Sequence, residues 1–174
     1  MLFRSALAEA LNQEAKALQD AGAAFVQFNE PAITQHKEDI ADFANAAQRL
    51  VAGLNVETAL YTYFGDVEGI YTQLLELPFD LIGLDFCTND KNDALVRRTP
   101  PSKKLGLGIV DARNSKLETS EQIAERIRSL GAGVSPDKVH VSPSHGLEFL
   151  PREVAQEKLR RMAQAVRETE AVPA

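Results

Sequence analysis

The stretch Leu105-Gly-Leu-Gly-Ile-Val-Asp111-Ala-Arg-Asn114 decides how this sequence is read, because an apolar run passes directly into a polar end. Gly106 and Gly108 carry no side chain, so another group can approach the backbone closely at these positions. Asp111 and Arg113 follow the apolar residues at once. The stretch therefore predicts a short buried strand that ends in ionisable side chains.

The same order of an apolar run and a polar end occurs four more times in the chain. The four stretches are Phe25-Val-Gln-Phe-Asn29-Glu30, Ala59-Leu-Tyr-Thr-Tyr-Phe-Gly65-Asp66, Asp80-Leu-Ile-Gly-Leu-Asp85 and Lys138-Val-His-Val-Ser142-Pro-Ser-His145. In parallel β/α proteins the carboxyl ends of the strands face one rim, and binding sites are built there. We therefore expect the polar ends of all these stretches to meet at a common rim.

Composition narrows the class of protein. The 174 residues are 44% hydrophobic and 25% charged, which is ordinary for a soluble globular protein. The net charge is −6 and no basic stripe stands out, so nucleic acid is not expected as a partner. No apolar run approaches the ~20 residues needed to cross a bilayer. The single cysteine, Cys87, excludes an internal disulfide and suits a cytoplasmic protein.

Helical and strand patterns alternate along the chain. Apolar periodicity predicts helices at about 2–21, 36–53, 66–77, 89–98, 119–130 and 151–168, and strands at about 24–30, 57–64, 80–86, 104–110 and 138–142. Asp66 is expected to be the N-cap of the third helix. Thr119 and Gln122 have the spacing of a capping box. This alternation predicts an α/β fold with parallel strands and right-handed crossovers.

The number of strands is too small for a closed barrel. A (β/α) barrel needs eight strands and usually roughly 250 residues. The chain, a single β/α domain over residues 1–174, is therefore an open doubly wound sheet or the last five units of a partial TIM-type barrel. The second interpretation predicts apolar strand edges at Phe25–Phe28 and Val139–Val141, which aggregate unless a partner covers them. It thus predicts a homo-oligomer or a complementary barrel partner.

Four segments taken together resemble the cobalamin-independent methionine synthase family. They are Val26-Gln-Phe-Asn-Glu-Pro-Ala32, Thr62-Tyr-Phe-Gly-Asp66, Leu107-Gly-Ile-Val-Asp-Ala-Arg-Asn114 and, more loosely, Val141-Ser-Pro-Ser-His-Gly-Leu147. The resemblance runs from about residue 8 to residue 162 and is closest to the N-terminal, zinc-free barrel of that family. It implies a β/α barrel fold and a relation to methyl transfer from methyl-tetrahydrofolate to homocysteine.

The resemblance also shows where this chain departs from the family. The catalytic barrel of the family holds zinc with one histidine, two cysteines and a glutamate, and the matching positions here are Tyr61, Tyr63, Asp85 and His145. Zinc prefers thiolate and imidazole ligands in a compact tetrahedron, so we expect no zinc cofactor.

Two further family positions are changed as well. The homocysteine-binding aspartate of the family falls on Asn29, and its catalytic histidine falls on Arg113. The chain is therefore expected not to be a complete catalyst, and no catalytic residue is assigned.

The candidate substrate-binding residues all lie at predicted strand ends. They are Asn29, Glu30, Tyr61, Tyr63, Asp85, Asp111, Arg113 and His145. Each also has a structural interpretation. Asn29 and Glu30 can form a turn, and the two tyrosines can fill the barrel. Asp85, Asp111 and Arg113 can form an ion-pair network, and His145 can be a hydrogen-bonded structural residue. Glu30 could reach Arg113 across the barrel. Cys87 is expected to be a small buried hydrophobe.

Three functions remain open at this level. The chain can be a zinc-free, substrate-binding or supporting half of a methionine-synthase-like protein. It can be a non-catalytic half-barrel that folds by oligomerising. It can also be a different small-molecule enzyme on the same scaffold, using Glu30, Asp85, Asp111 and Arg113.

Overall fold

Five parallel strands in sequential order form the centre of the computed structural model, which describes residues 2–131 and 134–170. The strands are β1 (Phe25–Asn29), β2 (Glu57–Tyr61), β3 (Leu81–Asp85), β4 (Lys104–Val110) and β5 (Val139–Pro143). Each pairs in parallel with its neighbour, in the order β1-β2-β3-β4-β5. The order never reverses, as it would at the switch point of a doubly wound sheet, so the sheet is half of a barrel.

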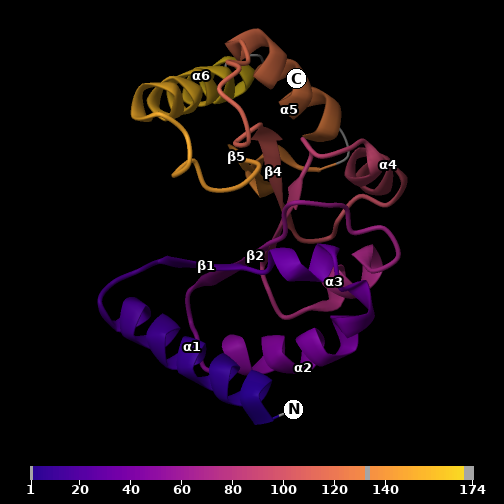
Figure 1. Ribbon diagram of the computed structural model, residues 1–174, viewed down its shortest axis with the longest axis vertical. Helices are drawn as coiled ribbons and strands as arrows, with labels where there is room; N and C mark the ends of the chain where they lie inside the picture. The colour runs from indigo at the N-terminus through magenta and orange to yellow at the C-terminus, as the bar shows by residue number, and fades with distance from the viewer. Residues whose placement is uncertain (1, 132–133, 171–174) are drawn as a thin grey trace.

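Helices alternate with the strands along the chain, beginning with α1 before β1, and cover the outer face of the sheet. They are α1 (Leu2–Asp20), α2 (Ile40–Leu50), α3 (Tyr71–Glu76), α4 (Lys91–Arg98), α5 (Ser120–Gly131) and α6 (Arg152–Glu170), with short 3-10 turns η1 (Pro31–Thr34), η2 (Lys37–Asp39) and η3 (Pro136–Lys138). In Figure 1, α1 and α2 lie at one end of the molecule and α5 and α6 at the other, with the strands between them.

The main hydrophobic core lies between the sheet and the helices. Alternate strand residues such as Leu60, Ile82 and Leu105 are fully buried there, next to helix residues such as Leu74 and Ile123. This follows from the two-residue period of a strand, which sends every second side chain to the helix layer. A second, smaller cluster on the opposite, inner face contains Ala59, Tyr61 and Leu81. The sheet is thus buried on both faces.

Two local signals read from the sequence have different outcomes. The capping box is confirmed, because Thr119 N–H donates to Gln122 Oε1 (2.9 Å) and Gln122 N–H donates to Thr119 Oγ1 (3.2 Å). The N-cap assigned to Asp66 is wrong, because α3 begins only at Tyr71. The Asp66 carboxylate instead accepts hydrogen bonds from Lys37 Nζ (2.7 Å) and from the N–H of Glu68 (3.1 Å). It therefore fixes a loop and does not start a helix.

The two outer strands and one helix leave apolar surface uncovered. β1 and β5 each pair on one side only, as expected for the edges of a half-barrel. On α1, Leu7, Leu11 and Leu18 are 50%, 43% and 44% exposed, whereas Ala8, Asn12 and Ala15 are buried. Asn12 Nδ2 donates a hydrogen bond to the carbonyl of Leu50 on α2 (2.8 Å). This exposed row of leucines is the feature that a covering partner would explain.

Candidate functional site at the carboxyl ends of the strands

The ring of Tyr61 lies across the backbone of two neighbouring strands. A Cβ atom at Gly83 would come within 2.2 Å of the Tyr61 ring, and one at Gly106 would come within 2.7 Å of its hydroxyl oxygen. Because Gly83 of β3 and Gly106 of β4 have no side chain, the side chain of Tyr61 on β2 can extend across them towards β5. Burial raises the pKa of Tyr61, and the hydroxyl of Ser142 on β5 counteracts part of this effect. Tyr61 therefore fills the inner face, in line with its interpretation as a barrel-filling aromatic residue.

Tyr63, Phe64 and His145 form an aromatic cluster at the rim. The ring centroids of Tyr63 and Phe64 are 4.8 Å apart with planes at 90°, and those of Phe64 and His145 are 4.7 Å apart at 61°. Tyr63 and His145 are 5.8 Å apart. Burial raises the pKa of Tyr63, and the negative charges of Glu148 and Glu30 raise it further. Two predicted site residues are thus brought together with a third ring that the sequence did not single out.

Phe64 has an unusual backbone that two hydrogen bonds hold in place. Its φ of 65° lies in the left-handed region, which is costly for a bulky residue. The N–H of Phe64 donates to Asp85 Oδ2 (3.2 Å), and its carbonyl accepts from Gln35 Nε2 (2.9 Å). The phenyl ring is 47% exposed in this conformation. The strain therefore keeps an aromatic ring at the solvent-facing rim.

Asp85 organises the loop that follows β3. Its side chain is buried, and Oδ1 accepts from the N–H groups of Cys87 (2.8 Å) and Thr88 (3.1 Å). Oδ2 accepts from the Thr88 hydroxyl (2.6 Å) as well as from Phe64. Four hydrogen bonds satisfy the buried carboxylate without a counter-ion in direct contact. Asp85 is therefore occupied by neutral donors of the protein itself and not by the Arg113 counter-ion that the sequence suggested.

Arg113 and Asp111 form an ion pair beside this loop. Arg113 Nε is 3.0 Å from Asp111 Oδ1, and the guanidinium also donates to the Thr88 hydroxyl (3.1 Å) and the Cys87 carbonyl (2.8 Å). Although partial burial opposes its ionisation, hydrogen bonds from Arg113 hold the pKa of Asp111 below its ordinary value. Of the predicted network, the ion pair between Arg113 and Asp111 is formed, and Asp85 is linked to it only through the Thr88 hydroxyl.

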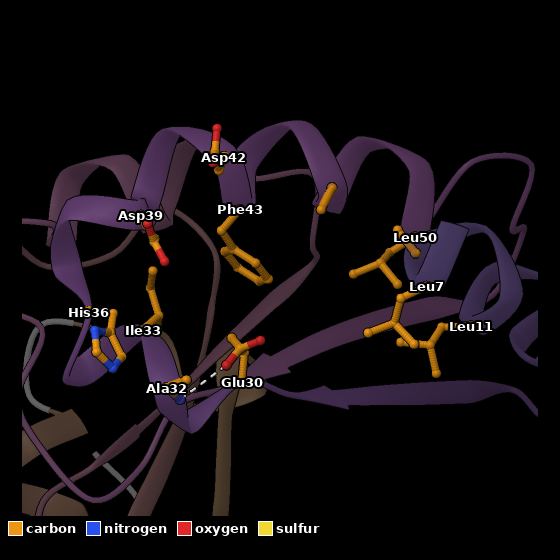
Figure 2. Close-up of a pocket in the computed structure, with 12 residues that line it drawn as sticks. Leu7, Leu11, Glu30, Ala32, Ile33, His36, Asp39, Asp42, Phe43 and Leu50 are labelled. Carbon is orange, nitrogen blue, oxygen red and sulfur yellow. Dashed lines mark hydrogen bonds between the residues drawn. The ribbon is translucent and has the colours of Figure 1, made fainter. Parts of the chain in front are cut away.

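Glu30 points away from this network and into the helix layer. One of its carboxylate oxygens accepts from the N–H of Ala32 (3.0 Å) and so caps η1. Glu30 lines a groove of about 480 Å³ between α1 and α2. In Figure 2 it lies beneath Phe43 in the middle of this groove, with Leu7 and Leu11 of α1 at one end. The partners of Arg113 are Asp111, Thr88 and Cys87, so the suggested reach of Glu30 to Arg113 across the barrel is not formed.

Asn29 and Cys87 have modest roles. Asn29 is exposed at the end of β1, where its Oδ1 accepts from Gln27 Nε2 (2.8 Å). The Cys87 thiol lies 3.4 Å from the Gly108 carbonyl oxygen, and burial together with the negative charge of Asp85 raises its pKa to about 12. A thiol in that state is a poor nucleophile at neutral pH, which fits the interpretation of Cys87 as a small buried residue.

The residues that connect the rim were not predicted from the sequence. They are Gln35, Phe64, Thr88, Ser142 and Glu148. Only Thr88 had a local signal, because a threonine three residues after an aspartate can close a side-chain turn. The others depend on contacts between distant segments.

The four positions that match the zinc ligands of the family do not fit a zinc ion. Within residues 2–131 and 134–170, no group of three or more histidine, cysteine, aspartate or glutamate side chains is placed to hold a metal. Asp85 already accepts four hydrogen bonds, and the ring of Tyr61 rests on glycine backbone. Tyrosine hydroxyls with raised pKa values stay protonated and are weak zinc ligands.

A parallel half-barrel with its polar groups at the carboxyl ends defines the class of the protein, and the comparison with known proteins defines its family. Residues 4–168 match the family described as the cobalamin-independent synthase, catalytic domain. The chain therefore belongs to the cobalamin-independent methionine synthase family, as the strand-end motifs indicated. The match is to the catalytic domain and not to the N-terminal, zinc-free barrel that the motifs resembled most, so that part of the expectation is wrong. The positions that match the metal ligands nevertheless carry Tyr61, Tyr63, Asp85 and His145 in this chain.

Curated relatives and solved structures agree with this assignment. The chain is 35% identical over 162 residues to a methionine synthase of Saccharolobus islandicus and 32% identical over 161 residues to that of Pyrococcus furiosus. Each alignment covers 92% of this chain, but 49% and 48% of the relatives. The chain thus spans about half the length of the curated relatives it matches.

The solved structures show the same fold. A B12-independent methionine synthase from Shewanella sp. W3-18-1, described in complex with selenomethionine, superposes with a TM-score of 0.86 at 24% identity, over 94% of this chain and 53% of the other. A putative vitamin-B12-independent methionine synthase from Listeria monocytogenes gives 0.77 at 18% identity, over 95% and 54%. These likenesses establish the half-barrel architecture. No helix in the described part of the chain is long and apolar enough to span a membrane.

Proposed function

We propose that this chain is a methionine-synthase-like half-barrel that binds part of a small substrate of methyl transfer, homocysteine or a methyl-folate, without zinc. It acts as a substrate-binding or supporting half and not as a complete catalyst. The proposal rests on one observation: the positions matching the zinc ligands carry Tyr61, Tyr63, Asp85 and His145, and Asp85 is saturated by protein hydrogen bonds. A thiol at this rim would have no metal to activate it.

The rim still offers groups that can hold a polar, partly apolar molecule. The exposed Phe64 ring and the Tyr63 ring supply apolar faces, and His145 supplies an acceptor nitrogen. The Shewanella protein, which shares the fold, is described as being in complex with selenomethionine. We therefore place the substrate at the strand ends and the chain in the cytoplasm, where its single thiol stays reduced.

Calorimetric titration of homocysteine and of methyl-tetrahydrofolate, each with and without zinc, tests this function. We expect at least one of the two to bind, with an affinity that zinc does not change. Tyr63→Leu should weaken that binding, and Tyr71→Phe, which alters a tyrosine that hydrogen-bonds Thr99 away from the rim, should not. Failure of both compounds to bind would remove the proposal.

A second role, assembly with another polypeptide, is favoured by the uncovered leucines of α1. Leu7 and Leu11 line one wall of the groove in Figure 2, and β1 beside it is an open edge strand. Because the relatives are about twice as long, the missing surface would be supplied by a second copy of this chain or by a polypeptide carrying the remaining strands.

Sedimentation velocity of the full chain tests the assembly. We expect a mass above that of the monomer, and we expect Leu11→Glu to reduce association while Leu159→Glu, which alters a leucine of similar exposure on α6, does not. This role would be contradicted if the chain sediments as a monodisperse monomer and its stability does not rise with protein concentration.

A further inference from the structure

The rim histidine has a ring nitrogen that nothing in the described part of the chain satisfies. His145 Nδ1 lies 2.9 Å from the carbonyl oxygen of Gly146, and a carbonyl can only accept. Nδ1 must therefore carry the proton in the neutral ring, which leaves Nε2 as a bare acceptor. Nε2 is buried and has no hydrogen-bond partner among the described residues. A buried acceptor without a donor is costly, and such groups call for an explanation.

The rings of Tyr63 and Phe64 pack against the ring that carries this acceptor. The Tyr63 and Phe64 planes meet at 90°, and both rings lie within 5.8 Å of the His145 ring centroid. Tyr63 and Phe64 meet edge to face, and the parts of the ring faces that this contact leaves free can hold the alkyl groups of a cation, because the face of an aromatic ring is electronegative. The strained backbone of Phe64 is maintained by Asp85 and Gln35, so the protein expends stability to keep this ring at the rim.

Negative charge lies close to the same place. The carboxylate of Glu148 packs over Gly146, so closely that a Cβ atom there would be 2.0 Å from its Oε2. Gly146 is the residue whose carbonyl orients the His145 ring. The cluster thus combines ring faces, one unsatisfied acceptor and a carboxylate, and these three features together complement an organic cation that carries an N–H group.

We propose that Tyr63, Phe64, His145 and Glu148 form a binding site for an alkylated ammonium ion. The N–H of the ion donates to His145 Nε2, its alkyl groups rest on the Tyr63 and Phe64 rings, and Glu148 balances its charge. The site shares Tyr63, Phe64 and His145 with the proposed substrate site, but it requires neither a thiol nor a folate, so trimethylammonium can bind even if homocysteine and methyl-folate do not. It accounts for the bare nitrogen, the strained phenylalanine and the adjacent carboxylate at once.

Three probes of similar size separate the contributions. Trimethylammonium has both the charge and an N–H, tetramethylammonium has the charge without a donor, and tert-butanol has a donor without the charge. Chemical-shift titration of the full chain should show trimethylammonium binding most tightly, with shifts centred on the rim residues. Equal binding of tert-butanol, or tighter binding of tetramethylammonium, would overturn the proposal.

The two histidines that contact phenylalanine rings supply a matched pair of variants. His145→Phe keeps a ring but removes the acceptor, and it should weaken trimethylammonium binding by about tenfold or more. His140→Phe makes the same change next to Phe25, away from the rim, and should leave binding unchanged. Unchanged binding in a folded His145→Phe protein would contradict the site. If this variant does not fold, the ranking of the three probes on the unmodified chain decides the matter.

Discussion

The rings of Phe25 and His140 stack with centroids 6.1 Å apart and planes inclined by 19°. Phe25 begins β1 and His140 lies in β5, so the contact joins the two strands that stand furthest apart in the sheet order. The sheet therefore curves until side chains from its two edges meet across the inner face. This closure helps to explain how Ala59 and Leu81 are fully buried on that face in a sheet of only five strands.

Removing the Phe25 ring should loosen this closure. Phe25→Ala is expected to lower the free energy of unfolding by about 1 to 2 kcal/mol, less than for a core phenylalanine because the ring is partly exposed. Urea denaturation measures the change. Phe149→Ala is the control, since that ring is 83% exposed and should contribute within about 0.5 kcal/mol. Equal effects of the two substitutions would show that the stack does not close the sheet.

A methyl group at Gly83 should collide with the Tyr61 ring. Gly83→Ala is expected to cost about 1 to 3 kcal/mol, because the added Cβ would lie 2.2 Å from a ring carbon. The cost should fall in a Tyr61→Ala background, and a double-mutant cycle by thermal unfolding measures this coupling. Gly131→Ala, whose Cβ would be 3.8 Å from its nearest neighbour, should be tolerated. Additive effects of the two substitutions would contradict the close packing.

The buried lysine of α6 should be important for stability. The Lys158 side chain is 0% exposed, and its Nζ is 2.8 Å from Glu118 Oε2 and also donates to the carbonyl of Lys116. Lys158→Met leaves the Glu118 carboxylate without its cation and should lower the free energy of unfolding by about 2 to 4 kcal/mol. Adding Glu118→Gln should restore part of the loss in the same denaturation experiment. A loss below about 0.5 kcal/mol would show that the pair contributes nothing.

The ion pair between Asp111 and Arg113 should make the free energy of unfolding depend on pH in the acidic range. The pKa of Asp111 is lowered in the folded chain, so its contribution is present above the ordinary aspartate value of ~3.9 and is lost as the pH falls through the folded pKa. NMR titration of the side-chain carboxyl should show a higher pKa in Arg113→Met. Arg152→Met, an exposed change at the start of α6, should leave it unchanged. An identical Asp111 titration in both variants would contradict the pairing.

Local sequence predicted the framework and not the contacts at the rim. The bounds of β4 agree with the sequence prediction, because Lys104 and Asp111 flank an uninterrupted apolar run. The capping box at Thr119 is likewise a local property. The engagement of Asp66 by Lys37, 29 residues away, gives no signal within the helix that Asp66 precedes. Such pairs depend on strand register and loop placement, which periodicity does not determine.

The candidate site shows the same division. Tyr61 and Asp85 are the last residues of β2 and β3, and His145 follows β5, so all three lie at the carboxyl ends of strands that share a direction. The saturation of Asp85, the bare Nε2 of His145 and the left-handed backbone of Phe64 arise from tertiary contacts. They decide what the rim can bind, and they become visible only in three dimensions.

Zinc binding tests the central claim most directly. The full chain, equilibrated with excess zinc, dialysed and analysed for metal, is predicted to retain a clearly substoichiometric amount, because Asp85 is saturated and two of the matching positions are tyrosines. Addition of homocysteine should not increase the retained zinc. One tightly held zinc per chain that is lost on His145→Phe would contradict the account, since it would show that these rim residues rearrange into a metal site.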